Sequence, residues 1–412
     1  MESIIFHIDV NSAFLSWTAL SLLEQGESID LREIPSIIGG DKEQRHGIVL
    51  AKSTYAKSYG IQTGEPIVNA FKKCPSLTMA APDHNMYRER SKKLMEFLSS
   101  ICPVIEQVSI DECYMDYSPI CHEYSSPIEA ANTIKNLIFE KFQFTVNIGI
   151  SDCKVLAKMA SDFQKPNLVH TLFSYEIKEK MWPLTVDNLF MCGHSSVETL
   201  HKLGILTIGD LAASEPSILI SHLKSHGKTL WEFANGIDNS KVEPLPEKAK
   251  GIGNSTTVSR DLETKEEAYK VLMSLAESVG SRLRNEKQKA GMISCEIKYS
   301  TFQSVSHQTT LPSPTDSTTL IYETAKILFD ELWNYNPIRL LGIRTSKLTD
   351  ISQPTQLTLF DIMTSDTNSS TSLNEEQYKR KKKQEQLDKA LDSIKLKYGK
   401  DSIVRGSLLK KK

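Results

Sequence analysis

Three carboxylates in this 412-residue chain have the type and position to do chemistry. Asp9 ends the apolar run IIFHIDV, and the adjacent Asp111 and Glu112 interrupt the run VSIDECYMD. Such charges are costly at a buried strand end unless they are compensated, and converging carboxylates repel one another unless cations lie between them. Oxygen ligands without His or Cys suit Mg²⁺ or Mn²⁺, and two such ions ~3.5–4 Å apart clamp the two oxygens of a phosphoryl displacement. The alternative is acids on exposed turns, which the flanking hydrophobic residues disfavour.

The elements that must position these acids follow from hydrophobic patterning. Residues 4–10 predict a buried strand, and a helix with Ser12 as its N-cap follows. The acidic pair lies where two further strands are joined tightly around 109–113. The remaining elements up to residue 170 are predicted as helices at 85–100 and 127–141, a strand at 144–151 and a helix that Pro166 stops. Because strands and helices interleave irregularly, we expect an α+β domain rather than a regular βαβ series.

Beyond residue 170 the pattern changes. Residues 174–240 predict short helices, and 241–251, with two prolines and mixed charge, predict a linker. Residues 252–348 predict a second block of strands and helices, in which 292–299 alternates apolar and polar residues as a half-buried strand does. Residues 350–378 are rich in Ser, Thr and Asn, and we expect them to be flexible.

Charge is unevenly distributed along the chain. The formal net charge of -2 argues against a nucleic-acid protein, but residues 379–412 carry 13 Lys+Arg against 4 Asp+Glu. This basic end suggests a polyanionic partner, with a solvated terminus as the alternative. Seven scattered cysteines, the lack of a signal peptide and the lack of a long apolar stretch favour a soluble, cytoplasmic protein with no membrane span.

Three motifs together carry a family resemblance. HIDVNSAF, VSIDECYMD and NIGISDCKVLAKMASDFQKPN occur in the order and spacing of the Y-family (DinB/UmuC-like) translesion DNA polymerases of bacteria, and the resemblance extends from residue 4 to about residue 348. It implies an α+β right-hand architecture with a separate α/β little finger. The implied regions are a palm (1–12 and 82–172), fingers (13–81), a helical thumb (173–240), a linker (241–251), a little finger (252–349) and a flexible tail (350–412).

The resemblance also assigns roles in the palm. Asp9, Asp111 and Glu112 would be the catalytic ligands of two Mg²⁺ ions, with Mn²⁺ as an alternative, and the main-chain carbonyl of Val10 would add a further ligand. Phe14 matches the aromatic steric gate that rejects a 2′-hydroxyl; without the resemblance, a core aromatic would be the simpler interpretation.

The nucleotide contacts implied by the family are only partly present. Lys165, in QKPN, matches the lysine that reaches the incoming triphosphate. In the fingers, Thr54 and Lys57 stand where the commoner pattern has a tyrosine and an arginine, so the grip on the phosphates is altered and closer to the UmuC-like branch. The candidate DNA contacts of the little finger are Arg260, Arg282, Arg284 and Lys298.

Two features of the C-terminal region suggest partners. Gln356, Leu357, Leu359 and Phe360 fit the peptide with which bacterial polymerases bind the sliding clamp (beta clamp). The basic segment 379–412 predicts non-specific, salt-sensitive affinity for DNA.

The resemblance therefore implies a monomeric, error-prone DNA polymerase that uses primer–template DNA and dNTPs. Two alternatives remain open at this point: a UmuC-like subunit that depends on an accessory protein, and a non-catalytic DNA- and clamp-binding factor.

Overall fold

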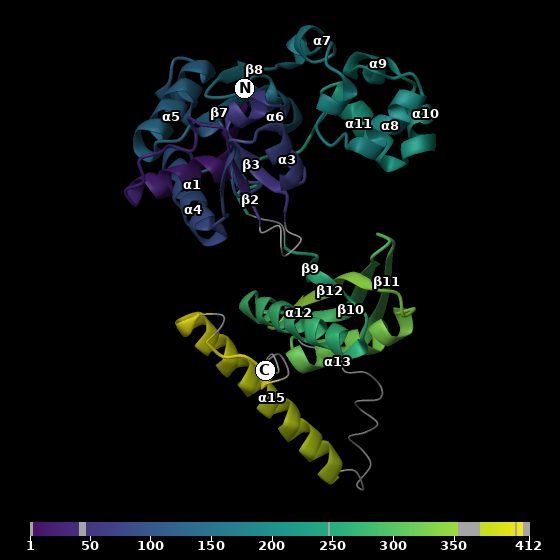
Figure 1. Cartoon of the computed structure of the whole chain (residues 1–412). Helices are drawn as coiled ribbons and strands as arrows, with labels where there is room; N and C mark the ends of the chain where they lie inside the picture. Colours follow the sequence, from purple (N-terminus) through teal and green to yellow (C-terminus); the bar gives the residue numbers. More distant parts are fainter. Residues whose placement is uncertain (1–2, 41–46, 246–247, 353–370, 400–401, 407–412) are drawn as a thin grey trace. The chain divides into compact units, whose positions relative to one another are not determined.

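The computed structural model describes residues 3–40, 47–245, 248–352, 371–399 and 402–406, without the side chains of 371–382. The chain divides into two compact units, which meet in sequence between residues 246 and 247 (Figure 1). The elements of the first unit are β1 (Ile5–Val10), α1 (Ala13–Glu24), β2 (Ser36–Gly39), β3 (Val49–Lys52), α2 (Thr54–Ser58), α3 (Ile67–Lys73), β4 (Thr78–Ala80), α4 (His84–Ile101), β5 (Ile105–Gln107), β6 (Glu112–Asp116), η1 (Ser118–Glu123), α5 (Pro127–Phe142), β7 (Val146–Ser151), α6 (Lys154–Asp162), β8 (Val169–Thr171), η2 (Ser174–Glu176), α7 (Ile177–Lys180), η3 (Val186–Asn188), α8 (His194–Lys202), α9 (Ile208–Ala213), α10 (Pro216–Leu223) and α11 (Ser225–Ala234).

A five-stranded sheet of order β5-β6-β1-β7-β8 forms the centre of the first unit. β1 pairs antiparallel with both β6 and β7, whereas β7 and β8 are parallel. Side chains alternate between the two faces of a strand, so Phe6, Ile8 and Val10 enter the core shared with α1, α4 and α5. His7 and Asp9 therefore face α6, which packs against β1 and β7. The α+β expectation for this region is confirmed.

α6 can approach the sheet closely because β7 carries a glycine beneath it. A Cβ built on Gly149 would lie 2.0 Å from the carbonyl oxygen of Ala157 and 2.5 Å from the amide nitrogen of Ser161. Any larger residue would push α6 away from the strand that carries Asp9. The predicted helix is present, but it ends at Asp162, four residues before Pro166.

A small three-stranded sheet of order β3-β2-β4 lies beside this centre in the first unit. β2 pairs antiparallel with β3 and parallel with β4, and its Ile37 packs with Val49 and Ile67 in a compact core. The chain enters this region through α1. Ser12 is the residue before α1, as predicted, but it has a left-handed backbone conformation. Its side chain makes no capping hydrogen bond, so the prediction that it caps the helix is wrong.

The second unit is a four-stranded antiparallel sheet of order β11-β10-β12-β9. Helices cover one face, where Ile293, Cys295 and Ile297 of β10 are buried, and the alternate residues form a more polar face. The predicted half-buried strand is therefore confirmed. The elements are β9 (Gly251–Leu262), α12 (Lys265–Asn285), β10 (Gln288–Tyr299), β11 (Ser304–Thr315), α13 (Thr318–Leu332), β12 (Ile338–Asp350) and α15 (Thr371–Tyr398).

The C-terminal helix α15 is attached to the second unit by charged side chains. Arg284 of α12 lies 2.5 Å from Asp392 and 3.6 Å from Asp388, measured from Nε and Nη1. Asp388 is 1% exposed, accepts a hydrogen bond from the backbone N–H of Thr318 at the start of α13, and pairs with Arg405 at 3.0 Å. Part of the basic segment is thus held by a largely buried ion-pair network.

This network predicts a stability effect. Asp388→Asn should lower the free energy of unfolding by about 2 kcal/mol, because it weakens the charge-assisted contacts of a buried carboxylate that Arg284 and Arg405 share, while each arginine keeps one other partner, Asp392 or Glu277. Urea unfolding measures the loss. Glu323→Gln is the matched control, since that carboxylate is 55% exposed and lies 3.9 Å from Lys326. Equal effects of the two substitutions would show that the network does not hold α15 in place.

Candidate active site

The pairing of β1 with β6 brings the predicted acids together. Asp9 lies directly opposite Glu112 in the antiparallel register, so both side chains project from the same face of the sheet. Asp111 immediately precedes β6, and its carbonyl oxygen accepts a hydrogen bond of 3.0 Å from the N–H of Val10. Two segments about a hundred residues apart in sequence thus meet where the strands end.

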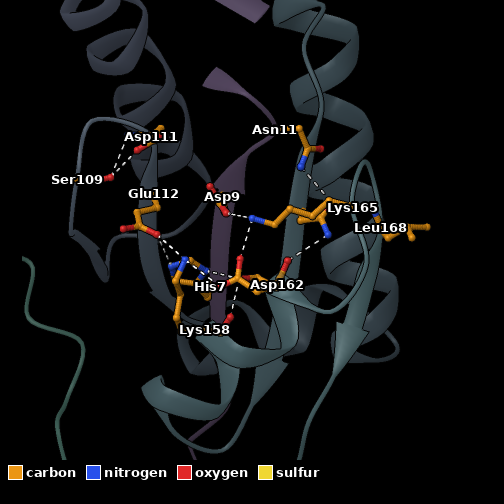
Figure 2. A network of polar contacts seen from close by, with 12 residues as sticks. His7, Asp9, Asn11, Ser109, Asp111, Glu112, Lys158, Asp162, Lys165 and Leu168 are labelled. Atoms are coloured by element: carbon orange, nitrogen blue, oxygen red, sulfur yellow. Dashed lines mark hydrogen bonds and ion pairs between the residues drawn. The ribbon is translucent and has the colours of Figure 1, made fainter. Parts of the chain in front are cut away.

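Two lysines supply counter-charges to these acids (Figure 2). The ammonium group of Lys165 pairs with Asp9 and lies 2.8 Å from Oδ1 of Asp162. Lys158 lies 2.8 Å from Oε2 of Glu112 and 3.4 Å from Oδ2 of Asp162. The sequence predicted that Lys165 would lie in the site. It gave Lys158 no role there, although Lys158 and Asp162 lie four residues apart on one face of α6.

A buried histidine contacts Glu112 from the side away from solvent. His7 is fully buried; its Nδ1 lies 2.8 Å from the hydroxyl of Ser161, and its Nε2 lies 3.2 Å from Oε2 of Glu112. Burial lowers the pKa of His7, which favours the neutral ring at neutral pH. The contact with His7, followed by that with Lys158, lowers the pKa of Glu112 to about 2. Sequence reasoning missed His7, yet its position two residues before Asp9 places both on one strand face.

Asp111 has the opposite electrostatic environment. Burial raises its pKa, and the charges of Asp9 and Glu112 raise it further, although the hydroxyl of Ser109 donates a hydrogen bond of 2.6 Å to Oδ1. No neighbouring positive charge therefore offsets, within the described residues, the effect of burial and of the two acids on the Asp111 carboxylate. Its oxygens, with those of Asp9 and Glu112, are the donors that a hard divalent cation prefers.

The carboxylates are not gathered into a ready-made metal centre. Within the described part of the chain, no three His, Cys, Asp or Glu side chains lie close enough to hold a metal ion together. Asp9 and Glu112 are each turned toward a lysine. The ammonium groups of Lys165 and Lys158 neutralise these two carboxylates in place of a metal ion. The donor set fits a divalent metal chemically, provided that these lysines give up their partners.

The environment of Asp111 predicts an unusual response to substitution. In metal-free buffer, Asp111→Asn should leave the melting temperature unchanged or raise it by about 2 °C, because it removes a poorly compensated buried charge. Asp162→Asn should lower it, since Lys158 and Lys165 outweigh burial and hold the pKa of Asp162 below its usual value. Differential scanning calorimetry distinguishes the two. A clear loss of stability in Asp111→Asn would mean that its charge is already compensated.

A pocket of about 290 Å³ opens in front of Asp9 and Asp111. Phe14 forms part of its wall and stacks on Tyr87, with the ring centroids 4.4 Å apart and the planes inclined by 7°. The ring is therefore held rigidly at the pocket surface while its other side joins the core. The lining residues are Asp9, Val10, Ser12, Ala13, Phe14, Leu50, Ala51, Lys52, Thr63, Asp111 and Lys165.

The residues expected from the fingers occupy different places. Thr54 and Lys57 lie on α2 with exposed side chains, and neither lines the pocket in this structure. Lys52 and Thr63, which sequence reasoning missed, do line it. Lys52 ends a four-residue strand, and no motif marked it.

The four DNA-contact candidates of the second unit differ in availability. The side chain of Arg284 is 10% exposed and pairs with Asp388 and Asp392. The structure therefore corrects the prediction that Arg284 contacts a DNA phosphate. Arg260 pairs with Glu267 but is 75% exposed, and Arg282 donates a 2.8 Å hydrogen bond to the carbonyl of Gly253. Lys298 lies 5.9 Å from the ring centroid of Phe302.

Some predictions fall where the structure gives no description. The residues predicted to bind the sliding clamp, Gln356, Leu357, Leu359 and Phe360, lie outside the described residues. Among the helices that are described, none is long and apolar enough to cross a membrane.

Comparisons with known proteins agree along the whole chain. Residues 8–162 match the model of the impB/mucB/samB family, and residues 249–359 match the model of that family's C-terminal domain. The chain is 46% identical over 411 residues to DNA polymerase IV of Clostridium acetobutylicum, covering 100% of this chain and 99% of that protein. It is 34% identical over 410 residues to DNA polymerase IV 1 of Bacillus subtilis, covering 99% and 94%.

A solved structure supports the architecture. The fold matches a chimeric Y-family DNA polymerase with a TM-score of 0.72, covering 84% of this chain and 99% of that chain. The two sequences are 22% identical, so this likeness bears on the fold alone.

Proposed function

The chain belongs to the impB/mucB/samB family of Y-family DNA polymerases, and we propose that it performs error-prone synthesis across damaged template DNA. It is a DNA-directed DNA polymerase with the right-hand fold of that family. The observation that carries the proposed site is the register of β1 and β6, which sets Asp9 opposite Glu112 with Asp111 beside a pocket. The relatives named as polymerases extend over the whole chain, which disfavours both a non-catalytic factor and a dependent subunit.

In the proposed reaction, the primer 3′-hydroxyl attacks the α-phosphate of a dNTP in line and displaces pyrophosphate. Family membership implies a divalent metal, and we propose two Mg²⁺ ions, held by Asp9, Asp111, Glu112 and the carbonyl of Val10. When bound, they would supply Lewis-acid stabilisation of the phosphate charge. His7 contacts Glu112 from the buried side, and Lys158 would have to release Glu112 for that carboxylate to hold a metal ion.

Lys165 and Phe14 have separate tasks in this proposal. Lys165 pairs with Asp9 and Asp162 in the structure, and it would exchange Asp9 for an oxygen of the triphosphate. Phe14, fixed by its stack on Tyr87, would fill the space that a 2′-hydroxyl needs. Lys57 and Thr54 would approach the phosphates from α2.

The proposed partners follow from the same family membership. Primer–template DNA and dNTPs are the substrates, and we propose that the reaction takes place in the cytoplasm, as the bacterial relatives suggest. Arg260, Arg282 and Lys298 would contact the DNA backbone from the second unit. We further propose that the protein works as a monomer and binds the sliding clamp through Gln356, Leu357, Leu359 and Phe360.

Primer extension by the purified full-length chain tests the function. With Mg²⁺ and dNTPs, extension is expected on an undamaged template and past an abasic site. A replicative polymerase, tested on the same two templates, controls for the block that the lesion imposes. Absence of extension on both templates at every protein concentration would refute the proposal, and extension that requires a cell extract would point instead to an accessory protein.

A further inference from the structure

Lys52 places a cation in the wall of the pocket in front of Asp9. It is the last residue of β3, and its side chain is partly buried. The pocket that it lines also contains Asp9, Phe14 and Lys165. Lys52 thus belongs to the small three-stranded sheet, whereas Lys165 follows α6, the helix that packs against the central sheet.

Among the described residues, Lys52 differs from the other two lysines of the site because it has no carboxylate partner. Lys165 and Lys158 each pair with two carboxylates. Across the part of the chain that the structure describes, no carboxylate lies within ion-pair distance of the Lys52 ammonium. The charge of Glu65 acts favourably on Lys52, but that carboxylate already pairs with Lys73 at 2.6 Å.

The surroundings of Lys52 also oppose its charge. Burial lowers the pKa of Lys52, and the positive charge of Lys57 lowers it further; Glu65 acts in the opposite direction, and Lys73 adds repulsion. A partly buried cation among like charges is unfavourable unless an anion joins it. The two neighbouring lysines, Lys57 and Lys73, therefore oppose the charge of Lys52 more than Glu65 supports it.

We propose that Lys52 is a binding residue for the triphosphate of the incoming nucleotide. The inference rests on the proposed function, because that function supplies a polyanion that must lie against Phe14 and Asp9. A DNA backbone phosphate carries a single charge, whereas a triphosphate concentrates several within a few ångströms. Lys52 and Lys165 stand on the walls of one small pocket, and together they suit such a ligand.

Lys52→Gln tests the proposal, because it removes the charge and retains a polar side chain of similar length. We expect the KM for dNTP to rise by about ten-fold, the loss typical of one charge-assisted contact. Equilibrium binding of dNTP in Ca²⁺ buffer, without turnover, should weaken by a similar factor. The melting temperature and the affinity for primer–template DNA should not change.

Two further variants complete the experiment. Lys72→Gln removes a charge from an exposed position on α3 outside the pocket, and it should leave the KM for dNTP unchanged. Lys52→Arg keeps the charge and should recover most of the binding lost in Lys52→Gln. An unchanged KM in Lys52→Gln, an equal effect of Lys72→Gln, or a loss of DNA affinity instead of dNTP affinity would each overturn the inference. Failure of the wild-type chain to extend a primer would instead refute the proposed function.

Discussion

Asp9→Asn is expected to reduce primer extension by about a thousand-fold, because the proposed mechanism asks this carboxylate for several kcal/mol of charge stabilisation. Asparagine keeps the size of the side chain and one oxygen, but it removes the negative charge. Asp9 lies opposite Glu112 in the sheet and pairs with Lys165. Single-turnover extension with saturating dNTP and DNA measures the effect on the chemical step.

The control lies at the other end of the neighbouring strand. Asp116 ends β6 and accepts a 2.8 Å hydrogen bond from the backbone N–H of Ser118, outside the pocket. Asp116→Asn should therefore retain close to wild-type extension, with both variants folded by calorimetry. If Asp9→Asn extended a primer as fast as Asp116→Asn, the carboxylate could not be a ligand of the reacting centre, and the site would have to be sought elsewhere.

The acidic residues could be predicted from sequence because each interrupts a strongly apolar run. The apolar patterning alone does not predict their mutual position, because the register between β1 and β6 joins residues that lie about a hundred positions apart; that prediction came from the family resemblance. The same limit applies to His7. Its place on the Asp9 face follows from strand alternation, but its partner Ser161 is 154 residues away. From the sequence alone, His7 therefore looks like an ordinary core residue.

Arg284 and Lys52 show two opposite errors of prediction from sequence: Arg284 was assigned a ligand that it does not face, and Lys52 was overlooked. Arg284 lies in the last turn of α12, and the sequence predicted that it contacts a phosphate. The carboxylates that pair with it belong to α15 and lie 104 and 108 residues later in the chain. Lys52 carries no motif, and its relevance appears only when β3 forms one wall of the pocket. In both cases the long-range partners of a cation, or their absence among the described residues, decide what it can bind.

Phe14→Ala is expected to reduce discrimination against ribonucleotides by about 10- to 200-fold, the range in which a pocket of this kind separates ligands that differ by one small group. The ring is held by its stack on Tyr87, so it cannot easily move aside for a 2′-hydroxyl. The substitution removes that wall and opens the space in front of Asp9. Incorporation of dNTP should fall less than incorporation of rNTP rises.

The measurement must separate this effect from a loss of packing, because the partly buried ring of Phe14 also packs against the core and its removal is destabilising. The ratio of kcat/KM for dNTP to kcat/KM for rNTP does so, since the fraction of folded enzyme cancels. Tyr87→Phe is the matched variant: it loses the 2.7 Å hydrogen bond to Thr18 but keeps an aromatic ring beneath Phe14. That variant should retain wild-type discrimination. A lower melting temperature in Phe14→Ala with an unchanged ratio would make Phe14 a core residue and leave the sugar selection to another part of the pocket.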